Sequence, residues 1–284
     1  MTVGICTDSH AQLPPELVDR FGVAVVPITV RIGECEYLEG VDLGIDEFYA
    51  RVASDQHATV TTSHPSSGQF ALAYDELAER GCTQILSIHA SADAAGTINA
   101  ARLAAHGSAV PVRLVDTSTR GFGVSCCVWA AGDAIAAGAS LEEASAIAES
   151  LAPRIGNVFV VGSLELVGQR RAAGVAGLTI EGAGAGDGIA VLSFRDGEVH
   201  VVDRVASMSD AVSAMALLAT GSGDALRVAV GTADCAAAPL SDALIRSVRD
   251  AANVVDVVAY RIGPSVSAQS GPGTVECFMF PTSP

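Results

Sequence analysis

The chain has 284 residues, a mass of 28.7 kDa and a formal net charge of −16 at pH 7. Such a charge repels phosphate backbones and anionic lipid surfaces, so nucleic acid is not an expected partner. All 16 basic residues are arginines, and the absence of lysine excludes Schiff-base chemistry, lysine nucleophiles and the P-loop lysine.

Hydrophobic residues make up 50% of the chain, but no apolar run approaches the roughly 20 residues that a membrane-spanning helix needs. The N-terminus lacks the basic flank and apolar segment of a secretory signal. The 7 cysteines are scattered and odd in number, which argues against a disulfide framework and favours small buried residues. We therefore expect a soluble, cytoplasmic protein without stable membrane insertion.

Strands and amphipathic helices alternate over the first half of the chain, which the length suggests is one of two domains. This alternation predicts a mostly parallel sheet flanked by helices in an N-terminal α/β domain, residues 1–153. Ser140 and Glu143 have the spacing of a capping box at the start of the last helix. The strands are expected at 3–7, 23–32, 84–89 and 112–115, and the helices at 14–22, 46–53, 67–80, 96–106, 122–137 and 141–152.

The order of elements changes in the second half, residues 154–284, where we expect a C-terminal α+β domain with a mixed or antiparallel sheet. Asp196 and Gly197 favour a hairpin between two of its strands. Strands are expected at 157–162, 188–194, 198–204, 227–232, 254–260 and 274–280, and helices at 164–171, 209–219 and 241–252.

The segment TTSHPSSGQF, residues 61–70, places several hydroxyl groups directly before a helix whose Phe70 and Tyr74 face the core. The unpaired amides of the first turn and the positive end of the helix dipole favour an anion there. The hydroxyls that could complete such a site belong to Thr62, Ser63, Ser66 and Ser67. Alternatively, one hydroxyl is only the helix cap and the others are solvated.

A second hydroxyl-bearing turn, SADAAGT at residues 91–97, follows the next strand and precedes the next helix. Ligands of open α/β sheets bind outside the carboxyl ends of the strands, where such turns converge. The two turns flank one strand and together strengthen the anion-site hypothesis, although both interpretations remain open.

Signals for other chemistry are weak. The glycine-rich EGAGAGDG lacks the GxGxxG register, and GxSxG, HExxH and CxxC motifs are absent from the sequence. Asp8 in CTDSH could be a nucleophile or metal ligand, but a turn capped by Asp8 or Ser9 is favoured. The histidines without ligand spacing are His57, His64, His89, His106 and His200. We therefore predict no catalytic residue, no metal site and no cofactor.

The sequence resembles the DegV family of fatty-acid-binding proteins. The resemblance covers nearly the whole chain and is carried by TDSHAQLP, VVPITV, EGVDLGIDEFY, TTSHPSSGQFALAYDEL, GCTQILSIHASADAAGT, LVDTSTRGFG and SGPGT. It implies a two-domain carrier, not an enzyme, that encloses one long-chain fatty acid between its domains. It further implies that the protein presents the carboxylate to a separate fatty acid kinase, which makes an acyl phosphate for phospholipid synthesis.

The resemblance also implies site residues. The family's threonine of the TSxP segment corresponds to Thr62 and its carboxylate-binding serine to Ser91, with Ser63 and Gln269 as further contacts. Gln269 stands where the family usually has a histidine before GPG. The family's LKxGGR segment is LELVGQRR here, so Arg170 and Arg171 are candidates for kinase docking or head-group contact.

Two further positions differ from the family pattern, with Ala92 in place of a second serine and Ala95 in place of the serine of SGT. The alternative function is an enzyme or a regulatory binding protein that acts on a small anionic metabolite at the same site. An enzyme of that kind lacks an evident base or nucleophile in this sequence.

Overall fold

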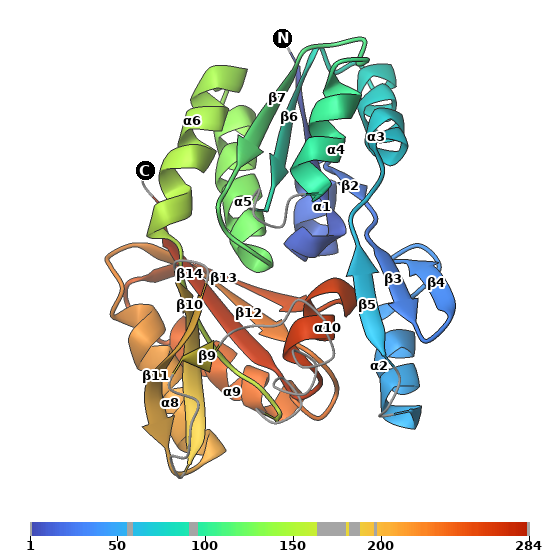
Figure 1. The fold of residues 1–284 in the computed structure, drawn as a ribbon. Helices are drawn as coiled ribbons and strands as arrows, with labels where there is room; N and C mark the ends of the chain where they lie inside the picture. The colour runs from blue at the N-terminus through green and yellow to red at the C-terminus, as the bar shows by residue number, and fades with distance from the viewer. Residues whose placement is uncertain are drawn as a thin grey trace. The chain divides into compact units, whose positions relative to one another are not determined.

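The computed structural model describes residues 2–55, 59–90, 96–163, 180–181, 188–195 and 198–282. The chain forms two compact units, one of Met1–Gly44 with Thr62–Arg154 and one of Ile45–Thr61 with Ile155–Ser283 (Figure 1). The predicted first domain ran without interruption, so the excursion of Ile45–Thr61 into the second unit was not anticipated. Its helix is held there by Tyr49, whose hydroxyl donates to the carbonyl oxygen of Ile262 at 2.9 Å.

The first unit contains the predicted parallel sheet, in the order β2-β1-β6-β7. Helices α3 and α4 pack on one face of this sheet and α5 and α6 on the other (Figure 1). The strands are β1 (Val3–Asp8), β2 (Ala24–Val26), β6 (Gln84–His89) and β7 (Val112–Asp116). The helices are η1 (Ser9–Ala11), α1 (Pro15–Phe21), α3 (Ser67–Glu79), α4 (Gly96–Ala105), α5 (Phe122–Ala136), α6 (Leu141–Leu151) and η3 (Ala152–Arg154).

A small sheet in the order β4-β3-β5 was only partly predicted. It consists of β3 (Thr29–Ile32), β4 (Cys35–Leu38) and β5 (Val60–Ser63). The single strand expected at 23–32 is in fact β2 and β3, which Pro27 separates because proline cannot donate to a ladder. β4 and β5 are short and largely solvent-exposed, so they lack the apolar pattern by which a strand is recognised.

The second unit contains a mixed seven-stranded sheet, in the order β13-β12-β14-β8-β10-β11-β9. The strands are β8 (Gly156–Val160), β9 (Ile180–Glu181), β10 (Ile189–Arg195), β11 (Glu198–Val205), β12 (Leu226–Thr232), β13 (Val254–Arg261) and β14 (Val275–Pro281). The helices are α2 (Ile45–Ser54), α8 (Met208–Thr220), α9 (Ala238–Arg249) and α10 (Pro264–Ser270). The predicted antiparallel pairing of β10 with β11 is confirmed. The predicted helix at 164–171 and the Asp196–Gly197 turn lie outside the described residues.

The two faces of this sheet differ. On one face, alternate strand residues such as Val158 and Val160 form a core with α8 and α9. The residues that alternate with them, Phe159 and Val161, belong to a separate apolar cluster with Ala190, Leu192 and Val199 on the opposite face, because successive side chains of a strand point to opposite sides.

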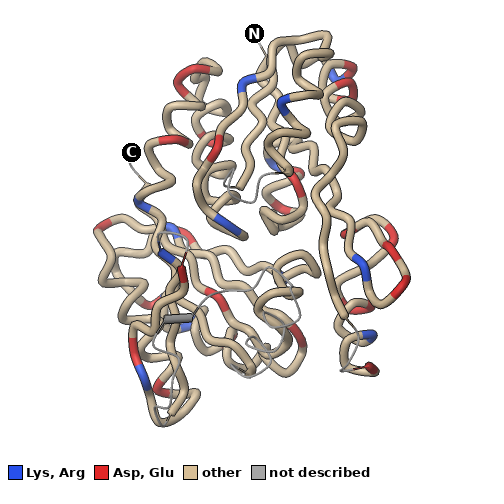
Figure 2. The backbone as a smooth tube through the Cα atoms, in the orientation of Figure 1, with Lys and Arg blue, Asp and Glu red and all other residues tan. Residues whose placement is uncertain are grey.

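Helix ends follow the sequence closely. Pro15 lies in the first turn of α1, and Gly22 ends it with a φ of 61°, a conformation that glycine adopts without strain. The capping box of Ser140 and Glu143 is confirmed. The prediction that all cysteines are buried is wrong for Cys35 and Cys235, which are exposed, and for Cys82, which is partly exposed. Arginines and acidic residues are distributed along the chain in both units (Figure 2).

Candidate ligand site at the carboxyl edge of the parallel sheet

The segment before α3 has two exposed hydroxyl groups that the helix does not use. Ser66 is the N-cap, since its Oγ accepts from the backbone N–H of Gln69 at 3.2 Å and the Gln69 side chain accepts from the N–H of Ser66 at 2.9 Å. The capping interpretation therefore holds for Ser66. Thr62 and Ser63, at the end of β5, are exposed and form no part of this cap.

The start of α4 lies beside this segment. A methyl group at Gly96 would lie 1.7 Å from Cδ2 of His64, so only glycine allows the imidazole to approach this closely. The His64 ring is held in turn by its Nδ1, which lies 3.1 Å from the carbonyl oxygen of Pro65. The segment before α3 and the first residue of α4 are thus in contact, as expected for turns that flank one strand.

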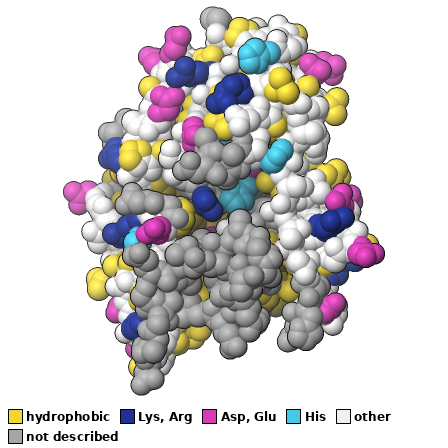
Figure 3. Space-filling view, viewed as in Figure 1, with side chains coloured by type: hydrophobic (Ala, Val, Ile, Leu, Met, Phe, Trp, Pro, Cys, Tyr) yellow, Lys and Arg dark blue, Asp and Glu magenta, His cyan; other side chains and the backbone are white. Residues whose placement is uncertain are grey.

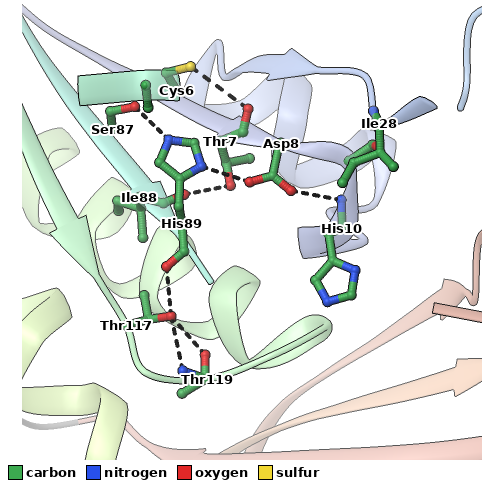
Figure 4. A network of polar contacts seen from close by, with 12 residues as sticks. Cys6, Thr7, Asp8, His10, Ile28, Ser87, Ile88, His89, Thr117 and Thr119 are labelled. Carbon is green, nitrogen blue, oxygen red and sulfur yellow. Dashed lines mark hydrogen bonds and ion pairs between the residues drawn. The ribbon is translucent and has the colours of Figure 1, made fainter. Parts of the chain in front are cut away.

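A buried polar network lies beneath this edge (Figure 4). Nδ1 of His89, the last residue of β6, is 2.7 Å from Oδ2 of Asp8, the last residue of β1. Nε2 of the same ring is 2.7 Å from Oγ of Ser87. His89 and Ser87 are 0% exposed and Asp8 is 2% exposed, so these hydrogen bonds form in a dry core.

The network reaches beyond these strands. Tyr74 of α3 places its hydroxyl 2.9 Å from Oγ of Ser87. Thr117, which follows β7, donates both its backbone N–H and its hydroxyl to the carbonyl oxygen of His89, at 3.1 and 2.9 Å. Asp8 also caps η1, since its Oδ1 accepts from the N–H of His10 at 3.1 Å. The preferred interpretation of Asp8 as a turn cap is confirmed.

The order of Asp8, His89 and Ser87 matches the carboxylate, imidazole and hydroxyl of a hydrolase triad. Burial excludes that role for this hydroxyl, because Ser87 is completely covered and its oxygen already contacts Tyr74. Sequence reasoning treated His89 as an ordinary histidine, since its partner Asp8 is 81 residues away. The available signal was local: Ser87 and His89 are two residues apart on one strand and therefore share a face.

The remaining predicted site residues fall elsewhere. Gln269 lies on α10 in the second unit and is partly buried. Ser91, Arg170 and Arg171 lie outside the described residues. Of the six residues predicted, the structure therefore brings together Thr62 and Ser63, which are neighbours in β5.

A buried carboxyl group in the second unit was also missed. Glu276 of β14 is 8% exposed, and the hydroxyl of Tyr260 donates to its Oε2 at 3.0 Å. Burial raises the pKa of Glu276 to about 7, and the hydrogen bond from Tyr260 opposes part of that rise. Gly231 makes the contact possible, because a methyl group there would lie 2.4 Å from Cζ of Tyr260.

The described residues hold neither a cluster of metal ligands nor a helix that could span a membrane. Among them, no group of three or more histidine, cysteine, aspartate or glutamate side chains is arranged to hold a metal ion. Within the same residues, no helix has the length and apolar character needed to cross a membrane.

These features define a class of two-unit α/β proteins in which a parallel sheet ends in hydroxyl-bearing turns and a mixed sheet carries a separate apolar face. The family model described as "uncharacterised protein, DegV family" matches residues 2–282. The chain belongs to the DegV family.

Related proteins match this chain over nearly its full length. A DegV domain-containing protein of Streptomyces coelicolor is 30% identical over 275 residues, 95% of each chain. A structure described as fatty acid binding of a DegV family protein from Thermus thermophilus is 26% identical, with a TM-score of 0.83 over 99% of this chain and 100% of that one. A stearic acid-binding protein of Eubacterium ventriosum shares the fold, with a TM-score of 0.82, 20% identity and 99% coverage of both chains.

Proposed function

We propose that this protein binds one long-chain fatty acid, with the end of β5, Thr62 and Ser63, supplying hydrogen bonds to the carboxylate. The observation that carries the proposal is the exposed pair of hydroxyls before α3, which the helix cap leaves available. The fatty acid bound by the Thermus thermophilus relative, at 26% identity, supports the choice of ligand.

The tail and the head group of the ligand contribute to binding in different ways. About 14 methylenes at roughly 0.8 kcal/mol each supply on the order of 11 kcal/mol, against association costs of about 4 to 15 kcal/mol. Tail burial therefore dominates affinity. Each hydrogen bond to the charged head group adds about 1.5 to 3 kcal/mol and fixes its orientation, because an unpaired carboxylate in a dry site is costly.

The net charge of −16 opposes an anionic ligand, but only weakly at the site. Charges at the surface are screened over about 8 Å in physiological salt, whereas hydroxyl groups act at contact distance. Acidic and arginine side chains are also interspersed on the face seen in Figure 3. Hydrogen bonds from nearby hydroxyl groups therefore contribute more to binding than the net charge of the protein opposes.

The other predicted residues complete the proposal. Ser91 and Gln269 would contact the same carboxylate, and Arg170 and Arg171 would contact the head group or a partner. In this proposal the protein is a cytoplasmic carrier without a cofactor, which presents the carboxylate to a separate fatty acid kinase. The kinase step rests on the family resemblance alone.

Mass spectrometry of the purified protein tests the ligand. We expect denatured extracts to contain about one acyl chain per protein, because the buried tail dominates affinity. If the protein carries no lipid and takes up neither palmitate nor oleate, the proposal is wrong. A bound phosphorylated or carboxylated metabolite would instead favour the alternative function.

Substitution of Thr62 by valine tests the head-group role. Thr62→Val removes one donor and should weaken palmitate binding about tenfold, equivalent to one hydrogen bond to a charged group. Hexadecanol, which has the same tail and no charge, should lose much less affinity. Equal losses for both ligands would place Thr62 at the tail or in the fold.

A further inference from the structure

The His89 ring connects the end of β6 to the first turns of α3. Besides its hydrogen bonds to Asp8 and Ser87, the ring packs edge-on against Phe70, with 5.1 Å between ring centroids. Phe70 lies in the first turn of α3 and is 0% exposed. The imidazole is therefore in contact with the start of α3 as well as with the ends of two strands.

The chemistry of Asp8 fixes one proton of this network. A carboxylate only accepts, so the hydrogen bond to Asp8 requires a proton on Nδ1 of His89. Nε2 of the ring lies 2.7 Å from Oγ of Ser87, which lies 2.9 Å from the hydroxyl of Tyr74, and that hydroxyl also donates to the carbonyl oxygen of Ala101 at 3.4 Å. Through Tyr74, α3 is therefore joined to the ends of two strands.

The exposed hydroxyls lie on the segment that this chain positions. Ser63 is followed within three residues by Ser66, which the capping box fixes to the first turn of α3. The His64 ring then touches Gly96 at the start of α4. A shift of α3 against β6 would therefore move Thr62 and Ser63 away from α4.

We propose that His89 is a positioning residue for the carboxylate site, which holds the Thr62–Ser63 segment in register with the end of β6. The inference rests on the proposed function. Hydrogen bonds weaken steeply with small errors in geometry, so a displaced segment loses recognition of the head group before it loses the tail.

Two variants test this role. His89→Asn keeps a donor near the place of Nδ1 but loses the bond to Ser87, and Tyr74→Phe removes only the hydroxyl that joins α3 to the chain. Ser145→Ala is the matched control, because Ser145 is a buried hydroxyl of α6 that bonds Arg113 and Glu149, away from this network. Each protein is titrated with palmitate and with hexadecanol.

For palmitate we expect about a tenfold loss in His89→Asn and about a threefold loss in Tyr74→Phe, with hexadecanol changed less than about twofold in both. Ser145→Ala should leave both affinities unchanged. Tyr74→Phe keeps the ring packing and so remains informative if His89→Asn does not fold. If the variants lose equal affinity for palmitate and for hexadecanol, or lose affinity for neither, His89 has no positioning role.

The network is also tested without ligand. Nitrogen-15 spectra of the imidazole should show a proton on Nδ1 of His89, and a ring without a proton there would overturn the hydrogen bond to Asp8. A wild-type protein that binds neither palmitate nor hexadecanol would instead overturn the proposed function, and this inference would fall with it. The two failures therefore give different results.

Discussion

The two units each bury a carboxyl group, and they stabilise it differently. Asp8 of the first unit accepts from His89 on one oxygen and from the His10 backbone on the other. Glu276 of the second unit accepts from the Tyr260 hydroxyl, and its pKa is raised to about 7 by burial. Donors stabilise a buried charge, whereas a carboxyl with too few of them retains its proton instead.

This contrast extends to the surroundings of each group. Around Asp8 the sheet ends in turns rich in hydroxyl groups, and the network joins two strands, the turn after β7 and a helix. The residue opposite Glu276 on the neighbouring strand β8 is Phe159, which belongs to the apolar cluster on the same face of the sheet. The surroundings of Asp8 are therefore polar, whereas those of Glu276 are apolar on this face of the sheet.

Removal of the Asp8 carboxyl should have the largest effect on stability. Asp8→Ala leaves Nδ1 of His89 and the N–H of His10 without their acceptor, and two hydrogen bonds of this kind are worth about 4 kcal/mol together. Urea denaturation should show this loss in the free energy of unfolding. A loss under about 1 kcal/mol would mean that the network does not stabilise the first unit.

The stability of the second unit should depend on pH through Glu276. Its pKa rises from 4.5 to about 7 on folding, so the folded state holds the proton more tightly. Stability from this group is complete below pH 4.5 and is lost as the pH rises through about 7. At about 1.4 kcal/mol per pKa unit, the loss approaches about 3 kcal/mol.

Glu276→Gln should remove this dependence, because the amide does not titrate. The difference in unfolding free energy between the variant and the wild type should therefore grow with pH, as measured by denaturation at several pH values. The exposed Glu198→Gln, which replaces a carboxylate by an amide at the surface, is the control. A difference that is constant with pH would contradict the raised pKa.

A smaller effect is expected from a methyl group beside Tyr260. Gly231→Ala would place its Cβ 2.4 Å from Cζ and 2.5 Å from the hydroxyl of Tyr260, so the ring must move away from Glu276. Overpacking of this kind costs about 2 kcal/mol, which thermal or urea denaturation would detect. Gly223→Ala is a suitable control, because its nearest atom would be 3.4 Å away. Equal stability of the two variants would contradict the tight contact.

Local patterns predicted most of the fold. The 3.6-residue periodicity and the capping residues located α3, α5 and α6 to within one residue at each end. Motif resemblance, not periodicity, indicated the ligand. Both kinds of information are contained in contiguous segments, which is why one sequence was enough to obtain them.

The parts that were missed depend on contacts between distant segments. Asp8 and His89 are 81 residues apart, and their partnership exists only because β1 and β6 are neighbours in the sheet. Likewise, Tyr260 of β13 reaches Glu276 of β14 across the intervening strand β12. It does so only because β12 has a glycine, Gly231, where the tyrosine ring passes over it. The order of strands in a sheet is not contained in any single segment.

The smallest expected effect concerns Ser66, for which the sequence alone allows two roles, helix cap or ligand donor. The first unit offers an internal comparison, because Ser66 with Gln69 and Ser140 with Glu143 form equivalent capping boxes. Ser66→Ala should cost about 1 kcal/mol of stability, with a similar loss for Ser140→Ala, and neither should change the preference for palmitate over hexadecanol.

The two boxes should respond differently to acid. Hydrogen bonds from Ser140 lower the pKa of Glu143, so that box contributes stability above the ordinary glutamate pKa and loses it as the pH falls through the lowered value. Gln69 does not titrate, so the cost of Ser66→Ala should stay constant over the same range. Denaturation of both variants between neutral and acidic pH measures this difference. If Ser66→Ala instead lowers palmitate affinity without lowering hexadecanol affinity, Ser66 serves the ligand as well as the helix, and the exposed pair Thr62 and Ser63 is not the whole donor set of this segment.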